Sequence, residues 1–205
     1  MVTIPCGDIC LEGAIGLPLG NRPFPVVVVC HPHPLYGGNM YNNVVTATCH
    51  ALLQSSISYL KFNFRSVGRS QGEHADGIGE QDDLLAAISF LLSAERIDPN
   101  RIGLCGYSFG AGVALAVAAR SEQVKALALV SPFLSQPSPI QSYHKPMLLL
   151  WGSEDFALPA ADLEYFIEKP PGTKQFEVMS GADHFWSGYE NEAADRVAAF
   201  FAGTL

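Results

Sequence analysis

The chain has 205 residues, of which 48% are hydrophobic and 16% charged, which is enough for one sizeable core and too little for two ordinary domains. With 12 Lys and Arg against 20 Asp and Glu, the formal net charge of −8 argues against a nucleic-acid partner. The sequence has no apolar stretch of membrane-spanning length and no secretory signal at its N-terminus. We therefore expect a cytoplasmic protein with no membrane partner and a single domain over residues 1–205.

Strand-like and helix-like patterns alternate along the chain, without a linker, repeat or low-complexity tract. The continuous β-branched run Val26–Cys30 predicts a strand buried on both faces. The alternation predicts a mostly parallel central sheet with right-handed crossovers and helices on both faces. In chain order the expected elements are a hairpin over Thr3–Cys6 and Ile9–Leu17, a strand over Val26–Cys30, a helix over Val44–Leu53, a strand over Ser58–Phe64, a helix around Leu84–Leu92, a strand over Arg101–Cys105, a helix ending at Ala119, strands over Val124–Val130, Met147–Trp151 and Gln175–Met179, and a helix over Asn191–Phe201.

The five cysteines form an odd number at irregular spacings, with no Cys-x-x-Cys pair. This pattern is typical of reduced, mostly buried thiols in a cytosolic protein. We therefore expect neither a disulfide nor a metal held by cysteines. The five are Cys6, Cys10, Cys30, Cys49 and Cys105.

The most informative motif is Gly106-Tyr107-Ser108-Phe109-Gly110, which reads Gly-x-Ser-x-Gly between a predicted strand and a predicted small-residue helix. A serine on such a sharp turn has a strained backbone, and its hydroxyl projects clear of the sheet. The flanking glycines remove side chains that would collide where strand and helix fold back. The helix N-terminus directs free N–H groups toward any oxyanion formed there. Ser108 is therefore the predicted nucleophile.

Two further polar loops follow predicted strands, one with Asp155 after Met147–Trp151 and one with His184 after Gln175–Met179. The carboxyl ends of parallel strands share one edge of a sheet, so these side chains can converge with Ser108. Serine needs a base within hydrogen-bond reach, and an acid holds the base in its useful tautomer. His184 is the predicted base and Asp155 the predicted acid.

The order Ser108, Asp155, His184 resembles that of the α/β-hydrolases. Within them the chain is similar to a group of small, lidless, bacterial-type serine hydrolases with His-Pro-His-Pro…Gly-Gly after the first central strand, here His31–Pro34 followed by Gly37-Gly38. This group is related to dienelactone hydrolases and esterase-like proteins. Dienelactone hydrolases are of similar size but use cysteine as nucleophile, and Ser108 departs from that pattern.

The resemblance implies a single-domain α/β-hydrolase fold, mostly parallel, with helices on both faces and no lid domain. Only residues 131–146 lie where many relatives insert a lid, so we expect an open site. The family's Gly-x-x-Asp-x-x-x-Pro spacing, here from Gly152 to Pro159, favours Asp155 over its neighbour Glu154 as the acid. Some relatives carry the acid one strand earlier, but Val130–Phe133 contains no carboxylate.

An oxyanion hole needs two backbone N–H donors. The elbow geometry assigns one to Phe109. The other should come from the loop after Val26–Cys30, where Pro32 and Pro34 have no N–H. His33 matches the donor of related His-Gly-x loops, and Leu35 is the alternate.

Other polar and aromatic residues near these loops have two interpretations each. His31-x-His33 lacks a third ligand at metal spacing, so we expect no metal and no cofactor. Arg65 and Arg69 either bind an anion or belong to an ion-paired loop that braces the site. Six aromatic residues are candidates for an apolar acyl or alcohol pocket, or for packing. They are Tyr36, Tyr41, Phe133, Phe156, Phe185 and Trp186.

The sequence therefore predicts a serine hydrolase that cleaves a carboxylic ester or related acyl bond of a small molecule through an acyl-enzyme. Amide, peptide or thioester hydrolysis on the same three residues remains an alternative. A non-catalytic hydrolase-fold binding protein is the alternative from another class. The sequence does not indicate an oligomeric state.

Overall fold

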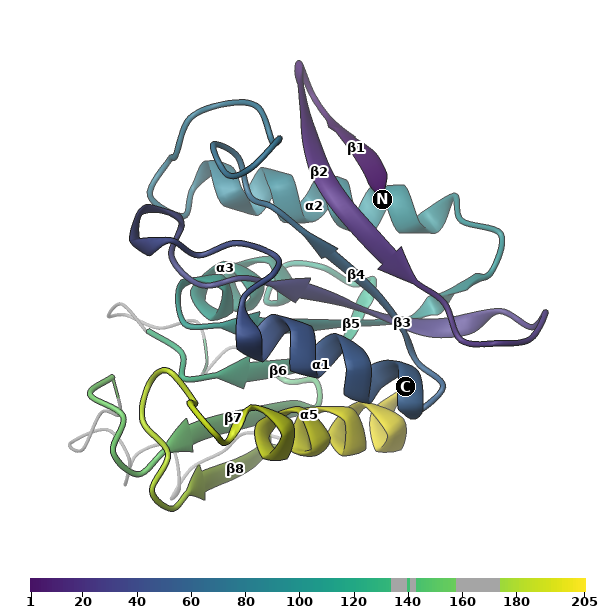
Figure 1. Cartoon of the computed structure of the whole chain (residues 1–205). Helices are drawn as coiled ribbons and strands as arrows, with labels where there is room; N and C mark the ends of the chain where they lie inside the picture. The colour runs from purple at the N-terminus through teal and green to yellow at the C-terminus, as the bar shows by residue number, and fades with distance from the viewer. Residues whose placement is uncertain (134–139, 141–142, 158–173) are drawn as a thin grey trace.

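The computed structural model describes residues 1–133, 140, 143–157 and 174–205, and its centre is an eight-stranded sheet in the order β1-β2-β4-β3-β5-β6-β7-β8 (Figure 1). β1 pairs antiparallel with β2, and β2 antiparallel with β4, whereas every pairing from β4 to β8 is parallel. The strands are β1 (Val2–Cys6), β2 (Ile9–Gly16), β3 (Phe24–Cys30), β4 (Ser58–Phe62), β5 (Ile97–Tyr107), β6 (Val124–Val130), β7 (Met147–Gly152) and β8 (Lys174–Met179).

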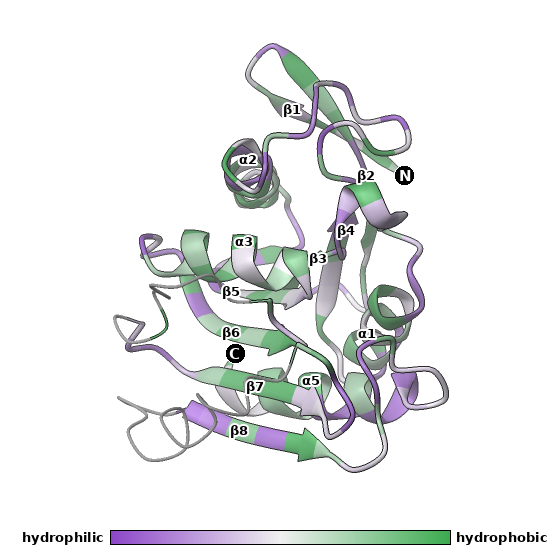
Figure 2. Ribbon diagram, turned by 90° about the vertical axis from the view of Figure 1, so that its left-hand side faces the viewer, coloured by the Kyte–Doolittle hydropathy of each residue, from purple (hydrophilic) through white to green (hydrophobic). Residues whose placement is uncertain are grey.

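Helices cover both faces of this sheet. α1 (Asn43–Gln54) and α5 (Glu190–Thr204) lie side by side on one face, and α2 (Gly79–Leu92) and α3 (Phe109–Ala118) lie on the other (Figures 1 and 2). Side chains of β3 alternate between the two cores, because Val26 and Val28 pack on the α2–α3 side and Val27 and Val29 on the α1–α5 side. The α/β-hydrolase fold, mostly parallel and single-domain, is confirmed.

Element boundaries differ from the predicted ones by a few residues, and hydrogen bonds explain two of the differences. β4 ends at Phe62 instead of Phe64, because the N–H of Phe64 leaves the ladder and donates to Nε2 of His31 over 3.0 Å. β5 begins at Ile97 instead of Arg101, because Ile97 still pairs with Phe24 before the register shifts. Residues 134–139 and 141–142 of the segment where a lid would insert lie outside the described residues, as do Leu158 and Pro159 of the acid loop.

All five cysteines are free, and four of them are buried while Cys10 is exposed. The expected absence of a disulfide is thus what the structure has. A helix long and apolar enough to cross a membrane does not occur in the described part of the chain.

Candidate active site

Ser108 occupies the sharp turn between β5 and α3, with φ 54° and ψ −116°. Its N–H donates to the carbonyl of Val130 at the end of β6 over 2.9 Å, which fixes the turn to the next strand. A side chain at Gly106 would overlap the backbone of Gly110 and Ala111, so that position requires glycine. The predicted sharp turn from strand to helix is therefore present at Ser108, and the neighbouring strands maintain its strained conformation.

The three predicted residues form one hydrogen-bonded chain at the carboxyl edge of the sheet. Oγ of Ser108 lies 3.0 Å from Nε2 of His184, and Nδ1 of His184 lies 2.8 Å from Oδ1 of Asp155. Because the carboxylate only accepts, Nδ1 carries the imidazole proton and Nε2 is left to accept from Ser108. The geometry is that of a nucleophile, a base and a group that orients the base.

Two other carboxylates, of Glu154 and Asp183, lie near the site in the sequence but do not contact the imidazole of His184. Glu154 is exposed, and its N–H donates to the carbonyl of Ala182. Oδ1 of Asp183 accepts from the N–H groups of Phe185 and Trp186 over 2.9 and 3.0 Å. Asp183 therefore shapes the turn that presents the base, and only Asp155 contacts it.

Asp155 is buried, and the pKa of its carboxyl reflects opposing effects. Burial alone raises this pKa, but hydrogen bonds from His184 and from the N–H of Ala157, together with the effect of the nearby Ser131 hydroxyl, outweigh it. The net pKa of Asp155 lies below its ordinary value. The acid is therefore ionised at neutral pH, as an acceptor for the Nδ1 proton must be.

Aromatic groups position the imidazole of His184. Its ring centroid lies 4.4 Å from that of Phe156, and the Tyr107 hydroxyl donates to its backbone carbonyl over 2.7 Å. Burial raises the pKa of Tyr107, so this hydroxyl stays protonated and remains a donor. The base is held at its backbone as well as at both ring nitrogens.

Phe109 and His33, the two predicted backbone donors of an oxyanion hole, both line the cavity that contains Ser108. The N–H groups of Phe109 and His33 have no hydrogen-bond partner among the described residues. The N–H of Leu35 donates to Nδ1 of His33 over 3.2 Å, so the alternate donor is already engaged. A side chain at Gly38 would overlap the carbonyls of Pro32 and His33, which explains the glycine at the return of this loop.

His31, directly before the loop that carries His33, is fully buried, and its ring stabilises the fold through two hydrogen bonds. Its Nε2 accepts from the N–H of Phe64 over 3.0 Å, and its Nδ1 donates to the carbonyl of Pro32 over 2.7 Å. Both ring nitrogens are thus used within the fold, which explains the His31-x-His33 pattern without a metal. A group of three or more His, Cys, Asp or Glu side chains suited to a metal does not occur among the described residues.

We predict that His31 makes stability fall in mild acid. Burial lowers the pKa of His31 from 6.5 to about 4, so below pH 6.5 the unfolded chain binds a proton that the folded chain does not. The stability that the neutral, buried His31 contributes is fully present above pH 6.5 and is lost as pH falls toward 4. The pKa difference corresponds to about 3 kcal/mol.

Urea unfolding from pH 7 to pH 4.5 measures this effect. His31→Gln should lower stability at pH 7 and flatten its dependence on pH. His50→Gln, which changes an exposed side chain of α1, is the matched control and should retain the wild-type slope. Equal slopes for wild type and His31→Gln would contradict the prediction.

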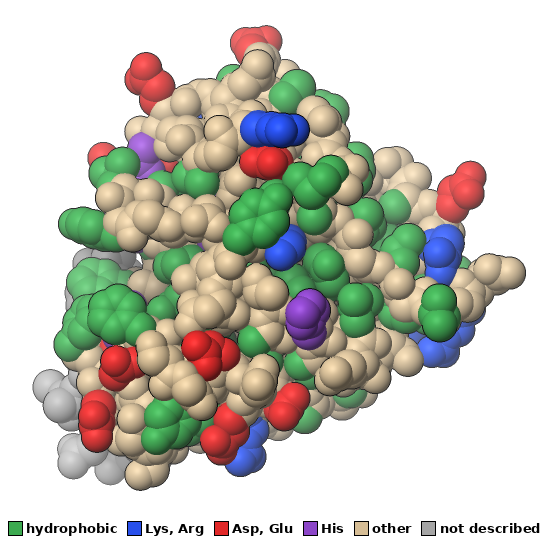
Figure 3. All heavy atoms as spheres, viewed as in Figure 1, with side chains coloured by type: hydrophobic (Ala, Val, Ile, Leu, Met, Phe, Trp, Pro, Cys, Tyr) green, Lys and Arg blue, Asp and Glu red, His purple; other side chains and the backbone are tan. Residues whose placement is uncertain are grey.

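A cavity of about 920 Å³ opens beside Ser108. Four of the six predicted aromatic residues line it: Tyr36, Phe133, Phe156 and Phe185. All four of these side chains are largely exposed. Figure 3 shows hydrophobic side chains gathered on the side of the molecule where the parallel strands end. The cavity is therefore open and mostly apolar.

The other two aromatic residues do not line the cavity. Tyr41 packs over the ammonium of Lys61, 5.0 Å from its ring centroid. Trp186 is fully buried and donates from Nε1 to Oγ of Ser131 over 2.9 Å. Assigning these two to the pocket was wrong, because ring position along the loop does not decide which way a side chain points.

The loop before α2 and the first turn of that helix contribute lining that the sequence did not predict: Asp76, Gly77, Ile78 and Gln81. These residues carry no motif, and only the packing of α2 beside α3 brings them to the nucleophile.

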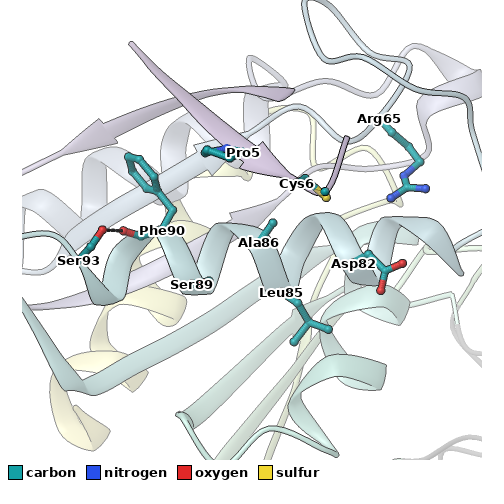
Figure 4. Close-up of a pocket in the computed structure, with 10 residues that line it drawn as sticks. Pro5, Cys6, Arg65, Asp82, Leu85, Ala86, Ser89, Phe90 and Ser93 are labelled. Carbon is teal, nitrogen blue, oxygen red and sulfur yellow. Dashed lines mark hydrogen bonds between the residues drawn. The ribbon is translucent and has the colours of Figure 1, made fainter. Parts of the chain in front are cut away.

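A second hollow, of about 600 Å³, lies between β1 and α2, away from Ser108 (Figure 4). Arg65 lines it, but Nη2 of this guanidinium lies 2.7 Å from Oδ1 of the fully buried Asp83. Burial and the neighbouring Asp83 raise the pKa of the Cys6 thiol there, so this thiol is not activated. Arg65 thus belongs to an ion-paired loop, whereas Arg69 contributes its backbone N–H to Glu12.

Comparison with known proteins agrees with this geometry. The sequence profile of the dienelactone hydrolase family matches residues 70–201. An uncharacterized protein of Rickettsia prowazekii (strain Madrid E) is 31% identical over 180 residues, which cover 79% of this chain and 72% of that protein.

Two solved structures are similar over almost the whole chain. One is an alpha-beta serine hydrolase homologue from Coxiella burnetii, with 34% identity, a TM-score of 0.85, and coverage of 97% of this chain and 95% of that one. The other is a serine hydrolase without a lid from Xanthomonas campestris, with 29% identity, a TM-score of 0.83, and coverage of 97% and 91%.

Proposed function

Because the chain belongs to the dienelactone hydrolase family, we propose that it is a serine esterase that cleaves uncharged carboxylic esters through an acyl-enzyme. The family and the structural relatives support hydrolase activity. The hydrogen-bonded chain from Ser108 through His184 to Asp155 carries the finer assignment, because it supplies an activated alcohol and not an activated thiol.

In the proposed reaction, Oγ of Ser108 attacks the ester carbonyl while Nε2 of His184 takes the hydroxyl proton. The carbonyl oxygen becomes an oxyanion that accepts hydrogen bonds from the N–H groups of Phe109 and His33. Collapse of this tetrahedral intermediate breaks the C–O bond, and His184 returns the proton to the leaving alcohol. Water then attacks the acyl-enzyme by the same route, which regenerates Ser108 and releases the acid.

The cavity supports an uncharged acyl substrate. Its described lining includes no Lys or Arg, whereas Asp76 places a carboxylate at its edge. A substrate carboxylate would lose water there without gaining a cation. The exposed rings of Phe133 and Phe156 instead offer apolar contact to an aromatic or branched acyl group.

We predict that an aryl ester with a carboxamide on its acyl ring is cleaved with a kcat/KM at least about tenfold higher than its carboxylate analogue, which has nearly the same shape. Asp76→Asn should narrow the ratio of the two kcat/KM values, because it removes the one carboxylate among the described cavity-lining residues. Steady-state kinetics on the two esters measure both effects. Equal kcat/KM values for the pair would contradict an uncharged-substrate site.

A fluorophosphonate probe tests the proposed function most directly, because it phosphonylates only activated serines. The wild-type protein should be labelled in a ratio of one per chain and should turn over short aryl esters. Absence of both labelling and turnover would favour a non-catalytic binding protein. Cleavage of matched amides or thioesters faster than esters would reassign the substrate class.

A further inference from the structure

Behind the acid lies a polar pair that the reaction scheme does not use. Trp186 follows the base in the His184 loop, and Ser131 is the first residue after β6. Both side chains are fully buried, and Nε1 of Trp186 donates to Oγ of Ser131 over 2.9 Å. We propose that Ser131, oriented by Trp186, is a positioning residue that holds the Asp155 carboxylate; this role rests on the proposed function.

The direction of the hydrogen bonds follows from the donor inventory. The indole Nε1–H can only donate, so Oγ of Ser131 must act as acceptor toward Trp186. The hydroxyl proton of Ser131 is then free for another acceptor. That hydroxyl helps to lower the pKa of the Asp155 carboxyl, which is the effect of a donor beside a carboxylate.

Asp155 has an oxygen that needs such a donor. Oδ1 accepts from His184 and from the N–H of Ala157, both over 2.8 Å. Oδ2 is completely buried, and none of the described residues makes a well-aligned hydrogen bond to it. A buried carboxylate oxygen without a donor is costly, and a serine hydroxyl can rotate to serve it. Ser131 is therefore suited to hold the carboxylate from the side opposite the base.

Backbone conformation supports a functional role for this pair. Ser131 has φ 44° and Trp186 has φ 61°, both in the left-handed region where residues other than glycine are strained. Glycine would relieve the strain at either position but would remove the hydroxyl or the indole. Ser131 and Trp186 are both strained, buried and joined by one hydrogen bond. This indicates that the contacts of their side chains, and not a preferred backbone conformation, determine which residues occupy the two positions.

Sheet topology explains why the contact is possible. β6 and β7 are parallel neighbours, so the residues after them, Ser131 and Asp155, emerge at the same edge. The N–H of Ser131 donates to the carbonyl of Leu150 in β7 over 2.7 Å, which fixes its backbone relative to the acid strand. This bond holds the backbone of Ser131, and with it the hydroxyl, in a fixed position relative to the strand that leads to Asp155.

Ser131→Ala tests the proposal. It should lower kcat on a short aryl ester by about 10- to 100-fold, the effect of removing one hydrogen bond to a buried charged group, with KM nearly unchanged. The acid limb of the kcat/KM profile should move to higher pH, because the Asp155 carboxylate has lost a donor and its pKa rises. Trp186→Phe keeps one aromatic ring but removes the pyrrole ring that carries the Nε1–H, and because Ser131 itself is retained it should give a smaller fall in kcat.

Ser58→Ala is the matched control, because Ser58 is also fully buried, in β4, and its hydroxyl has no partner among the described residues. It should leave kcat and the acid limb as in wild type. A kcat for Ser131→Ala within twofold of wild type, or an unmoved acid limb, would overturn the proposal.

A measurement without turnover separates this proposal from the proposed function. ¹³C NMR of labelled aspartate carboxyls, assigned with Asp155→Asn, follows the protonation of Asp155 directly. The pKa of Asp155 should be higher in Ser131→Ala than in wild type and unchanged in Ser58→Ala. If the wild type hydrolyses nothing but this shift is seen, the hydrogen bond is right and the function is wrong. If turnover occurs and the shift is absent, Ser131 does not hold the acid.

Discussion

Ser108→Ala is expected to abolish ester hydrolysis and fluorophosphonate labelling, with a fall in kcat on the order of 10⁶-fold. Without Oγ, His184 has no hydroxyl to deprotonate and no acyl-enzyme can form. The free N–H groups of Phe109 and His33 remain, so a small residual rate above that in water is expected. Alanine has no greater backbone strain than serine at φ 54°, so the fold should persist, as circular dichroism and thermal unfolding would show.

Ser66→Ala is a matched control for this result. Ser66 also has a positive φ, 68°, and is exposed, but its hydroxyl makes no hydrogen bond to a histidine of the described part of the chain. The control should retain wild-type turnover and labelling. Full labelling of Ser108→Ala would show that another residue is the nucleophile.

Asp155→Asn is expected to lower kcat by about 10⁴-fold while leaving the fold and substrate binding nearly intact. The asparagine amide can donate to Nδ1 of His184, which shifts the imidazole proton to Nε2. Nε2 then cannot accept the proton of Ser108. Kinetics on a short aryl ester measure the loss, and residual labelling by the fluorophosphonate probe should slow in parallel.

The neighbouring carboxylate provides the control for the acid. Glu154→Gln removes an exposed charge one residue away and should change kcat by less than about twofold. A severe loss in Glu154→Gln together with a mild one in Asp155→Asn would reverse the assignment of the acid.

Much of this site could be predicted from the sequence because its chemistry depends on strand ends. Ser108, Asp155 and His184 each follow a strand that the sequence pattern predicts, and parallel strands bring the positions after their carboxyl ends to one edge of the sheet. The loop that starts at His31 was also predictable, because two prolines restrict which N–H groups it can offer.

The rest depends on side-chain directions and packing that no local pattern encodes. The sequence predicted Trp186 as a pocket residue because it lies on a predicted site loop, but its indole is buried and contacts Ser131. Ser131 carried no signal, because a lone serine after a strand is common. The lining from Ile78 and Gln81 required knowing where α2 begins and which helix lies beside it.

The strands buried on both faces have a consequence for the newly synthesised chain. Val26–Val29 and Leu148–Leu150 are uncharged apolar runs in strands, the kind of segment that aggregates when exposed. β3 must find β5 across some seventy intervening positions, and such distant parallel pairing is slow. Pro25 at the start of β3 and Pro146 directly before β7 interrupt these runs where they begin. The buried strands that make the folded site rigid thus leave the newly synthesised chain dependent on these prolines to limit aggregation until the sheet has formed.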